Sequence, residues 1–387
     1  MTHPTAGYVL IACDKFKGSL TGEQVADHLS AGLLLESPGL DVRRVPVADG
    51  GEGTLAAAVA AGFGHVPVTC TGPTGEPVDS GYARKGDKAV LEMADACGLS
   101  RLPGPLSELP RVDPRTVART ASSRGLGEMI AAALDAGVTR LVVGIGGSAS
   151  TDGGVGMLTA LGARFFDAAG RPLRPGGVAL NELAEVDLSG LHPGLGTAEV
   201  EVASDVSNPL LGPHGSAAVF AAQKGAEPAD VAALESGLSR LAEVTATVTG
   251  RDRTTQPGAG AAGGVGWALL AILAARIRPG VELVLDLSRF ADIVAGARLV
   301  ITGEGSVDGQ TLQGKAPIGV ARAAREARVP VVTVCGRCLL SAAEVRDAGL
   351  GVAYPLIDLE PDPRRSMPHA AALLRLVGRQ IARELLS

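Results

Sequence analysis

Aromatic side chains, cysteines and excess positive charge are all scarce in this chain of 387 residues. Only 3% of the residues are Phe, Trp or Tyr, which leaves too few rings for a platform that stacks single-stranded nucleic acid. The formal net charge is -6, so no basic face for nucleic acid or an anionic membrane is indicated. The five cysteines are odd in number, which is typical of a reduced protein rather than a disulfide scaffold.

Long hydrophobic runs are also missing. The first apolar run, residues 8–13, ends at Asp14 and Lys15, which is not the pattern of a signal peptide. The most apolar helix candidate, residues 265–277, contains Arg276 and is too short to span a bilayer. We therefore expect a cytoplasmic protein that binds neither nucleic acid nor a membrane. The sequence leaves its oligomeric state open.

Buried-strand patterns alternate with helix patterns along most of the chain. This alternation predicts an α/β fold with a mainly parallel sheet. Residues 67–90 instead show short alternating segments with turn signals, which predict antiparallel hairpins. The clearest expected strands are residues 8–13, 42–47, 141–145, 200–203, 299–302, 331–335 and 351–356, and the clearest expected helices are 21–35, 317–328, 342–348 and 369–385.

Two domains are expected from this pattern. Residues 1–65 and 291–387 together predict a discontinuous, doubly wound domain with a parallel sheet. Residues 66–290 predict a second, mixed α/β domain inserted between its two parts.

Glycine is the abundant residue. The chain contains 53 glycines, about twice the usual share of about 7%. Many cluster in four loops, residues 13–19, 47–54, 144–154 and 303–315, each where an expected strand gives way to a helix. In open α/β sheets ligands bind at such places, because helix N-termini offer unpaired N–H groups and a positive dipole end.

The side chains in these loops suit phosphates and a hard metal ion. Asp49 and Glu52 supply oxygens of the kind that Mg²⁺ prefers. The third loop combines glycines with Ser148, Ser150 and Asp152, as expected of a phosphate-binding nest. In the fourth loop, residues 309–315 resemble a P-loop, but the following residue is alanine rather than Ser or Thr, so only Lys315 is kept as a phosphate-binding candidate.

Another strand end carries Asp205 and Asn208, a pair that suits a metal ion or a substrate hydroxyl group. No activated Cys–His or Ser–His pair accompanies these groups. Acids, lysines and backbone N–H groups match what phosphoryl transfer needs, which is positioning, charge neutralisation and an acceptor for the hydroxyl proton.

Seven motifs in a fixed order resemble the type-1 family of bacterial glycerate kinases over essentially the whole chain. They are Asp-Lys-Phe-Lys-Gly-Ser at 14–19, Asp-Gly-Gly-Glu-Gly-Thr at 49–54, the glycine and hydroxyl loop at 146–154, Asp-Val-Ser-Asn-Pro at 205–209, Gln-Lys-Gly-Ala at 223–226, the glycine cluster at 258–264, and Gly-Glu-Gly-Ser-Val-Asp-Gly-Gln-Thr-Leu at 303–312. The resemblance implies ATP-dependent phosphorylation of D-glycerate, usually at the 2-hydroxyl, in a cleft between a flavodoxin-like domain and the inserted domain.

Roles for individual residues follow as hypotheses from this resemblance. Lys17 and Lys315 are expected to pair with the substrate carboxylate or the ATP phosphates. Asp205 or Asp308 is expected to be the general base, with Asp152 third. The metal candidates are Asp49, Glu52 and Glu304, and the substrate- or phosphate-binding candidates are Asp14, Lys15, Ser19, Gly146, Gly147, Ser148, Ser150, Asn208, Lys224, Gln310 and Lys315.

Lys15, Arg124 and Ser204 depart from the usual family pattern, so a kinase of another small hydroxy acid or sugar acid stays open as an alternative. A non-catalytic metabolite sensor is a second alternative, although it predicts the loss of loop acids that are present here. An acyl-phosphate isomerase or phosphatase is a third, and it would need no ATP.

Overall fold

The structure is a computed structural model that describes residues 7–102 and 113–386. The chain folds into two compact units. Unit 1 comprises residues 1–49, 56–61 and 279–387, and unit 2 comprises residues 50–55 and 62–278. The sequence predicts domain boundaries at 65/66 and 290/291, and the second of these falls at the start of the short helix α11 (Phe290–Val294). These domain limits stay a prediction, and each unit is described separately below.

Unit 1 has a five-stranded parallel sheet in the order β13-β12-β11-β1-β2. Counted within the unit, this is the order 2-1-3-4-5 of flavodoxin-like folds, as the sequence predicts. The strands are β1 (Tyr8–Cys13), β2 (Val42–Arg44), β11 (Ala297–Val307), β12 (Val331–Cys338) and β13 (Val352–Pro355).

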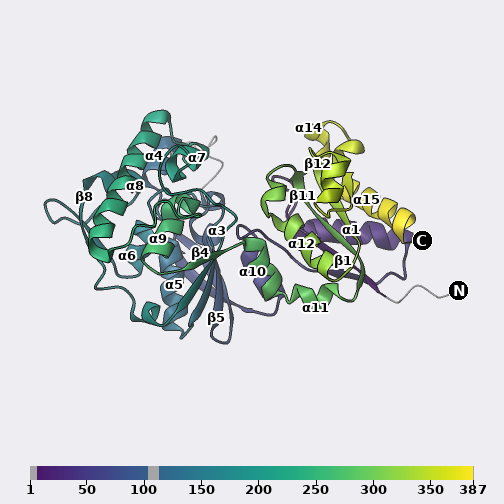
Figure 1. Ribbon diagram of the computed structural model, residues 1–387, viewed down its shortest axis with the longest axis horizontal. Coiled ribbons are helices and arrows are strands. Elements are labelled where there is room, and N and C mark those ends of the chain that lie inside the picture. Colours follow the sequence, from purple (N-terminus) through teal and green to yellow (C-terminus); the bar gives the residue numbers. More distant parts are fainter. Residues whose placement is uncertain (1–6, 103–112, 387) are drawn as a thin grey trace. The chain divides into compact units, whose positions relative to one another are not determined.

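Helices cover both faces of this sheet (Figure 1). In β1, Val9 and Ile11 pack with α1 (Gly22–Glu36) and α15 (Ala370–Leu385), whereas Leu10 belongs to the core on the opposite face. Side chains of a strand alternate between the two faces, so a strand covered on both sides is apolar throughout. The opposite face is covered by α10 (Gly280–Leu287), α11 and α12 (Ala316–Glu326), and further helices of this unit are α13 (Ala342–Asp347) and α14 (Pro363–Ser366).

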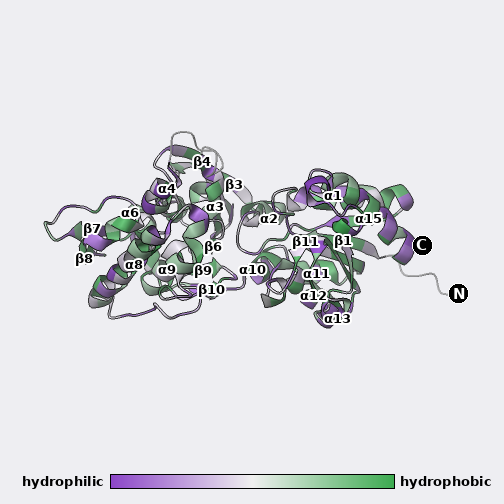
Figure 2. Cartoon of the chain, turned by 90° about the horizontal axis from the view of Figure 1, so that it is seen from above, coloured by the Kyte–Doolittle hydropathy of each residue, from purple (hydrophilic) through white to green (hydrophobic). Residues whose placement is uncertain are grey.

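Helices α1 and α15, which come from opposite ends of the sequence, pack against each other. α1 begins with a capping box, since the Thr21 hydroxyl accepts from Gln24 N and the Gln24 side chain accepts from Thr21 N. A Cβ atom on Gly378 would lie 2.6 Å from the Leu29 carbonyl oxygen, so the helix backbones approach closely there. Apolar residues of α15 face the sheet and its charged residues face outward, which appears as green and purple segments along the helix (Figure 2).

Unit 2 has a six-stranded mixed sheet in the order β10-β9-β6-β5-β4-β3. β3, β4 and β5 are antiparallel neighbours, which confirms the predicted hairpins, and the other pairs are parallel. The strands are β3 (Gly64–Thr71), β4 (Pro77–Lys85), β5 (Lys88–Glu92), β6 (Arg140–Gly144), β9 (Glu199–Ala203) and β10 (Arg276–Arg278), and β7 (Arg164–Asp167) pairs separately with β8 (Leu183–Asp187).

Helices of unit 2 pack around one apolar core that includes Trp267. The longest is α8 (Pro228–Thr249). The others are α3 (Met93–Cys97), α4 (Pro114–Thr120), α5 (Arg124–Asp135), α6 (Val155–Ala160), α7 (Ser216–Phe220) and α9 (Val265–Ala271), and α2 (Thr54–Ala60) has residues in both units.

The expected helix at residues 265–277 is shorter in the structure. α9 ends at Ala271, Ala274 adopts a left-handed conformation with φ of 52°, and β10 then pairs with β9. The sequence does not mark this change, because buried strands and buried helices have the same apolar composition. Within residues 7–102 and 113–386 no helix is long and apolar enough to cross a membrane.

Candidate active site

In unit 1 the candidate residues lie where the order of the strands reverses. Cys13 of β1 pairs in register with Gly303 of β11, and Asp14 N donates to the Gly303 carbonyl at 2.8 Å. Asp14 therefore directly follows β1 and lies beside Glu304, which is still paired within the adjacent parallel strand β11. In doubly wound sheets this reversal point is where ligands bind.

The carboxylates at this point repel one another. Burial, assisted by repulsion from Asp49 and Glu304, raises the pKa of Asp14 to about 7, although Lys15 opposes the shift. Burial also raises the pKa of Glu304, and hydrogen bonding by Thr311 and the charge of Lys315 oppose it. Three candidate acids thus share one electrostatic environment that a bound cation would stabilise.

Glu304, Asp308 and Lys315 are linked through a residue that the sequence analysis did not single out. The Thr311 hydroxyl donates to Glu304 Oε1 at 2.6 Å and accepts from Asp308 N at 2.9 Å. Lys315 Nζ lies 3.5 Å from Glu304 Oε2. The spacing of Asp308 and Thr311 is the kind of local turn pattern that could have indicated this link. Asp308 Oδ1 also accepts from Gln310 N at 2.9 Å, while the Gln310 side chain is exposed.

The first loop presents the ammonium group of Lys17 to solvent. Lys17 is exposed, whereas Lys15 is half-buried. The hydroxyl of Ser19 donates to the Met367 carbonyl at 2.9 Å, so in this structure it fastens the loop to the residues after α14. A shallow hollow of about 400 Å³ lies beside this loop and is lined by Gly18, Ser19, Leu20, Pro363, Arg364, Met367 and Pro368.

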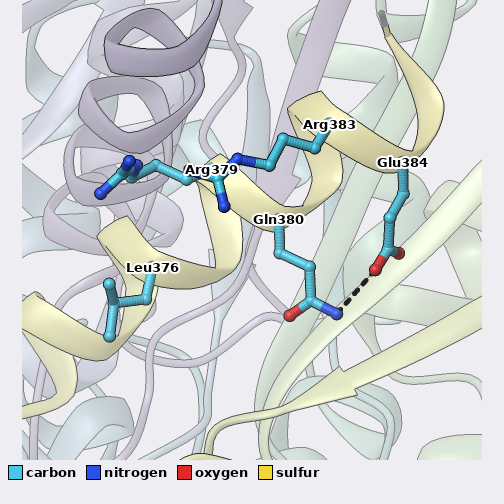
Figure 3. A pocket seen from close by; sticks show the side chains of 5 residues that line it. All are labelled: Leu376, Arg379, Gln380, Arg383 and Glu384. Carbon is cyan, nitrogen blue, oxygen red and sulfur yellow. Dashed lines mark hydrogen bonds between the residues drawn. The ribbon is translucent and has the colours of Figure 1, made fainter.

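A second hollow in unit 1 lies along α15 and lacks the chemistry of the loops (Figure 3). Arg379 and Arg383 both pair with Glu36, and Gln380 Nε2 donates to Glu384 Oε1 at 2.9 Å. Arg298, at the start of β11, donates to the Leu386 carbonyl, so the C-terminal end of α15 lies near the amino-terminal ends of the parallel strands. The hollow therefore lies at the end of the sheet opposite to the candidate loops, which follow the carboxyl ends of the strands.

In unit 2, three glycine-containing loops meet at the carboxyl ends of β6 and β9. Gly144 of β6 pairs with Ala203 of β9, so the loops that follow these strands leave from one edge. A Cβ on Gly50 would lie 2.5 Å from the Ala203 carbonyl oxygen, and one on Gly146 would lie 2.6 Å from Gly51 Cα. Only glycine permits such close approach of backbones. The motifs around residues 50, 146 and 205 are thus neighbours within this unit.

The loop at residues 146–150 is held from inside by Lys224. This side chain is 1% exposed, and its Nζ donates to Ser148 Oγ at 3.0 Å and to the Ser150 carbonyl. Burial lowers the pKa of Lys224 to about 7, and the charge of Asp152 opposes the shift. Ser148 and Ser150 are buried with it, while Gly147 is exposed. In this structure Lys224 therefore binds the loop itself rather than facing solvent.

Asp152 is occupied by hydrogen bonds from the chain. Its Oδ2 accepts from Ser123 N and Ser123 Oγ, both at 2.8 Å, and from Gly156 N at 3.1 Å. Its Oδ1 accepts from Gly154 N at 3.1 Å, and the side chain is 1% exposed. This geometry favours a structural carboxylate at the start of α6 and argues against the sequence-based suggestion that Asp152 serves as the base.

The other candidates in unit 2 are more accessible. Asp205 and Asn208 are half-buried, and Asn208 Nδ2 donates to the His214 carbonyl at 2.8 Å. Glu52 is exposed. Its loop is supported by Glu92, whose Oε2 accepts from Gly53 N and Leu55 N. Glu92 was missed by the sequence analysis, although an acid that directly follows the apolar run of β5 was a visible signal.

The donor set fits Mg²⁺, although no metal centre is preformed. Across residues 7–102 and 113–386, no group of three or more His, Cys, Asp or Glu side chains is arranged to hold an ion. Mg²⁺ usually takes one or two protein carboxylates and completes its shell with water and substrate phosphates. The position of Asp14 beside Glu304 at the strand reversal, with the Asp49 charge also acting on Asp14, favours a cation here.

Comparisons with known proteins agree on one family. The family model described as "Glycerate kinase family" matches residues 9–386. The chain is 43% identical to glycerate kinase of Bacillus subtilis (strain 168), covering 97% of this chain and 96% of that protein. It is 41% identical to glycerate 2-kinase of Escherichia coli (strain K12), covering 90% of each. A crystal structure of a proposed glycerate kinase 2 from Salmonella typhimurium LT2 superimposes with a TM-score of 0.80 at 40% identity and covers 99% of each chain.

Proposed function

Because the chain belongs to the glycerate kinase family, we propose that it phosphorylates D-glycerate with ATP as the phosphoryl donor, Mg²⁺ as the metal ion and the 2-hydroxyl group as the acceptor. Glycerate phosphorylation follows from the family. The E. coli relative named glycerate 2-kinase supports the choice of the 2-hydroxyl. The donor, the metal ion and the acceptor position are the parts that need testing.

The observation that carries the proposal is the grouping of Asp14, Asp49 and Glu304, with Lys15 and Lys315 beside them, at the strand reversal of unit 1. Bound Mg²⁺ would neutralise phosphate charge at the Asp49 and Glu304 side of this group. Lys315 stands directly before α12, where its ammonium group and the helix N-terminus both favour an anion. Lys17 is exposed and long enough to hold a substrate carboxylate or a phosphate group.

Unit 2 contributes a loop expected to bind phosphate and a candidate for the general base. The loop at residues 146–150 supplies backbone N–H groups, and Lys224 and the close contact with Gly51 hold its shape. Asp205 is half-buried and follows β9, next to the loop that follows β6, so we retain it with Asp308 as the candidates for the base that accepts the hydroxyl proton. That the two groups of residues face a common cleft stays a prediction.

Arg124 bears on substrate choice. Its Nε donates to Glu128 Oε1 at 2.8 Å, so its charge is compensated on its own helix. Because Arg124 is paired in this way, its presence gives little reason to expect a substrate other than glycerate. Lys15 and Ser204, which directly precedes Asp205, remain as departures from the usual motif within the candidate site.

The test is ADP release by the purified protein, measured with D-glycerate, L-glycerate, glycolate, lactate and a set of sugar acids. We expect D-glycerate to give the highest kcat/KM, and ³¹P NMR of the product to show a phosphate on the secondary hydroxyl. Higher kcat/KM for another acid would replace the substrate assignment. Phosphorylation of the primary hydroxyl would overturn the acceptor assignment. Turnover without ATP would show that the protein does not act as an ATP-dependent kinase.

A further inference from the structure

Thr311 joins three of the candidate residues of unit 1 although it is itself completely buried. Its hydroxyl donates to Glu304 and accepts from Asp308 N. Its carbonyl accepts from Gly314 N and Lys315 N, both at 3.3 Å. Thr311 thus contacts the Glu304 carboxylate on β11, the turn that carries Asp308, and the backbone of Lys315 before α12.

We infer that Thr311 is a positioning residue for phosphoryl transfer, which holds the Glu304 carboxylate and the Asp308 turn in the arrangement that receives the metal-bound phosphate. This inference rests on the proposed function, because the roles of Glu304 and Asp308 belong to it. Thr311 is completely buried, so the inference is that it acts through these neighbours.

The hydrogen bonds determine which way Glu304 points. A hydroxyl group has a single proton, and here that proton goes to Glu304 Oε1, because Asp308 N is itself a donor. Oε2 then faces the Lys315 ammonium group. The carboxylate therefore cannot rotate freely between its neighbours, and hydrogen bonds to a charged group are the stronger kind.

Threonine suits this position better than serine or valine. Branching at Cβ restricts χ1, so the hydroxyl stays in one orientation. Valine has nearly the same shape but would leave Glu304 Oε1 and Asp308 N without this partner in a buried environment. Serine keeps the hydroxyl and loses only the methyl group. The pair Thr311→Val and Thr311→Ser therefore separates the hydrogen bonds from the packing.

Thr333, in β12 of the same unit, provides a matched control. It is also completely buried, and its hydroxyl donates to the Leu350 carbonyl at 2.8 Å, so it has a comparable buried hydrogen bond without a link to Glu304. We expect Thr333→Val to lower the melting temperature of the protein and to leave metal dependence unchanged. It thus measures the effect of losing a buried hydroxyl alone.

The main measurement is the Mg²⁺ concentration that gives half-maximal turnover at saturating glycerate and ATP. We expect Thr311→Val to raise it at least about tenfold and to lower kcat by about 10- to 100-fold, with a smaller change in KM for glycerate. Thr311→Ser should restore most of both values. If Thr311→Val matches the wild type, or if Thr311→Ser is impaired to the same extent, the inference is wrong.

A binding measurement does not depend on turnover. Mn²⁺ in the presence of ADP can be followed by the EPR signal of the free ion, and we expect Thr311→Val to weaken its binding about tenfold while Thr333→Val does not. Equal Mn²⁺ affinity in the wild type, Thr311→Val and Thr333→Val would overturn the inference even if glycerate phosphorylation is established. Failure of the wild type to phosphorylate glycerate, with the Mn²⁺ difference intact, would instead count against the proposed function alone.

A double-mutant cycle with Glu304→Gln covers the case in which Thr311→Val fails to fold. Thr311→Ala, which also removes the hydroxyl, replaces it in that cycle. If Thr311 acts through Glu304, the change in Mn²⁺ affinity on substituting Thr311 should be much smaller in the Glu304→Gln background. Additive effects would show that Thr311 does not act through Glu304.

Discussion

Cys13 and Gly303 pair across β1 and β11, so Asp14, which directly follows β1, and Glu304, which continues β11, occupy neighbouring positions although 290 positions separate them in the chain. Neither acid is unusual in its own segment, and both follow apolar runs. Their proximity arises from the strand order, which brings the start and the end of the chain to adjacent strands.

Replacing Asp14 tests, through stability, the cost of burying its carboxylate beside other acids. Its pKa is about 7 in the folded protein and has a reference value of 3.8, so between these pH values the folded state binds the extra proton. The free energy of unfolding contributed by Asp14 therefore falls as pH rises through this window. Asp14→Asn should remove that fall, so the variant should be stabilised relative to the wild type more at pH 8 than at pH 5. Chemical denaturation at both pH values checks this, and an equal difference at both would contradict it.

Lys224 predicts a pH dependence of the opposite sign. Its pKa is about 7 when folded against a reference value of 10.5, so the unfolded state binds more protons between these values. The free energy of unfolding should rise with pH over that window, and Lys224→Met should abolish the rise. The same variant loses the bonds to Ser148 and Ser150, so we also expect a higher KM for ATP. Unfolding curves at pH 7 and pH 9.5, with steady-state kinetics, measure both effects, and unchanged values of both would exclude a role for the buried ammonium group.

The candidates for the base can be separated by asparagine substitutions. If Asp205 or Asp308 is the base, its Asn variant should lose about 10²- to 10⁴-fold in kcat and keep its melting temperature. Asp152→Asn should instead lower the melting temperature, because an amide N–H₂ group cannot accept the bonds from Ser123 and Gly156. An Asp152→Asn protein that melts normally and is inactive would return Asp152 to the list of bases.

The close approach of two loops in unit 2 gives a prediction about Gly146. A Cβ at this position would lie 2.6 Å from Gly51 Cα, so Gly146→Ala must push the two backbones apart. We expect a loss of activity of at least about tenfold and a lower melting temperature. Gly39→Ala is the control, because a Cβ there meets nothing within 4 Å. Equal behaviour of the two variants would show that the loop contact is not needed.

Much of the fold and part of the site could be predicted from the sequence. Apolar runs identified the parallel strands, and glycine clusters identified the loops at their carboxyl ends, because both signals are local. Thr311 and Glu92 could not be ranked, since their importance lies in bonds to partners on other elements. The surroundings of Asp152 were hidden for the same reason, because Ser123, which donates twice to its carboxylate, is remote in sequence. The end of α9 depended on the backbone conformation of Ala274.

The close packing of Gly32 and Gly378 in α1 and α15 has a consequence for biosynthesis. The central strand β1 has β2 on one side but requires β11 on the other, and its helical cover is completed by α15. During synthesis β1 therefore emerges well before β11 and α15, the elements that complete its surroundings, because unit 2 lies between them in the chain. Loss of α15 should therefore expose the apolar side chains of β1 first. Chaperones and proteases would then bind or cleave this unprotected strand.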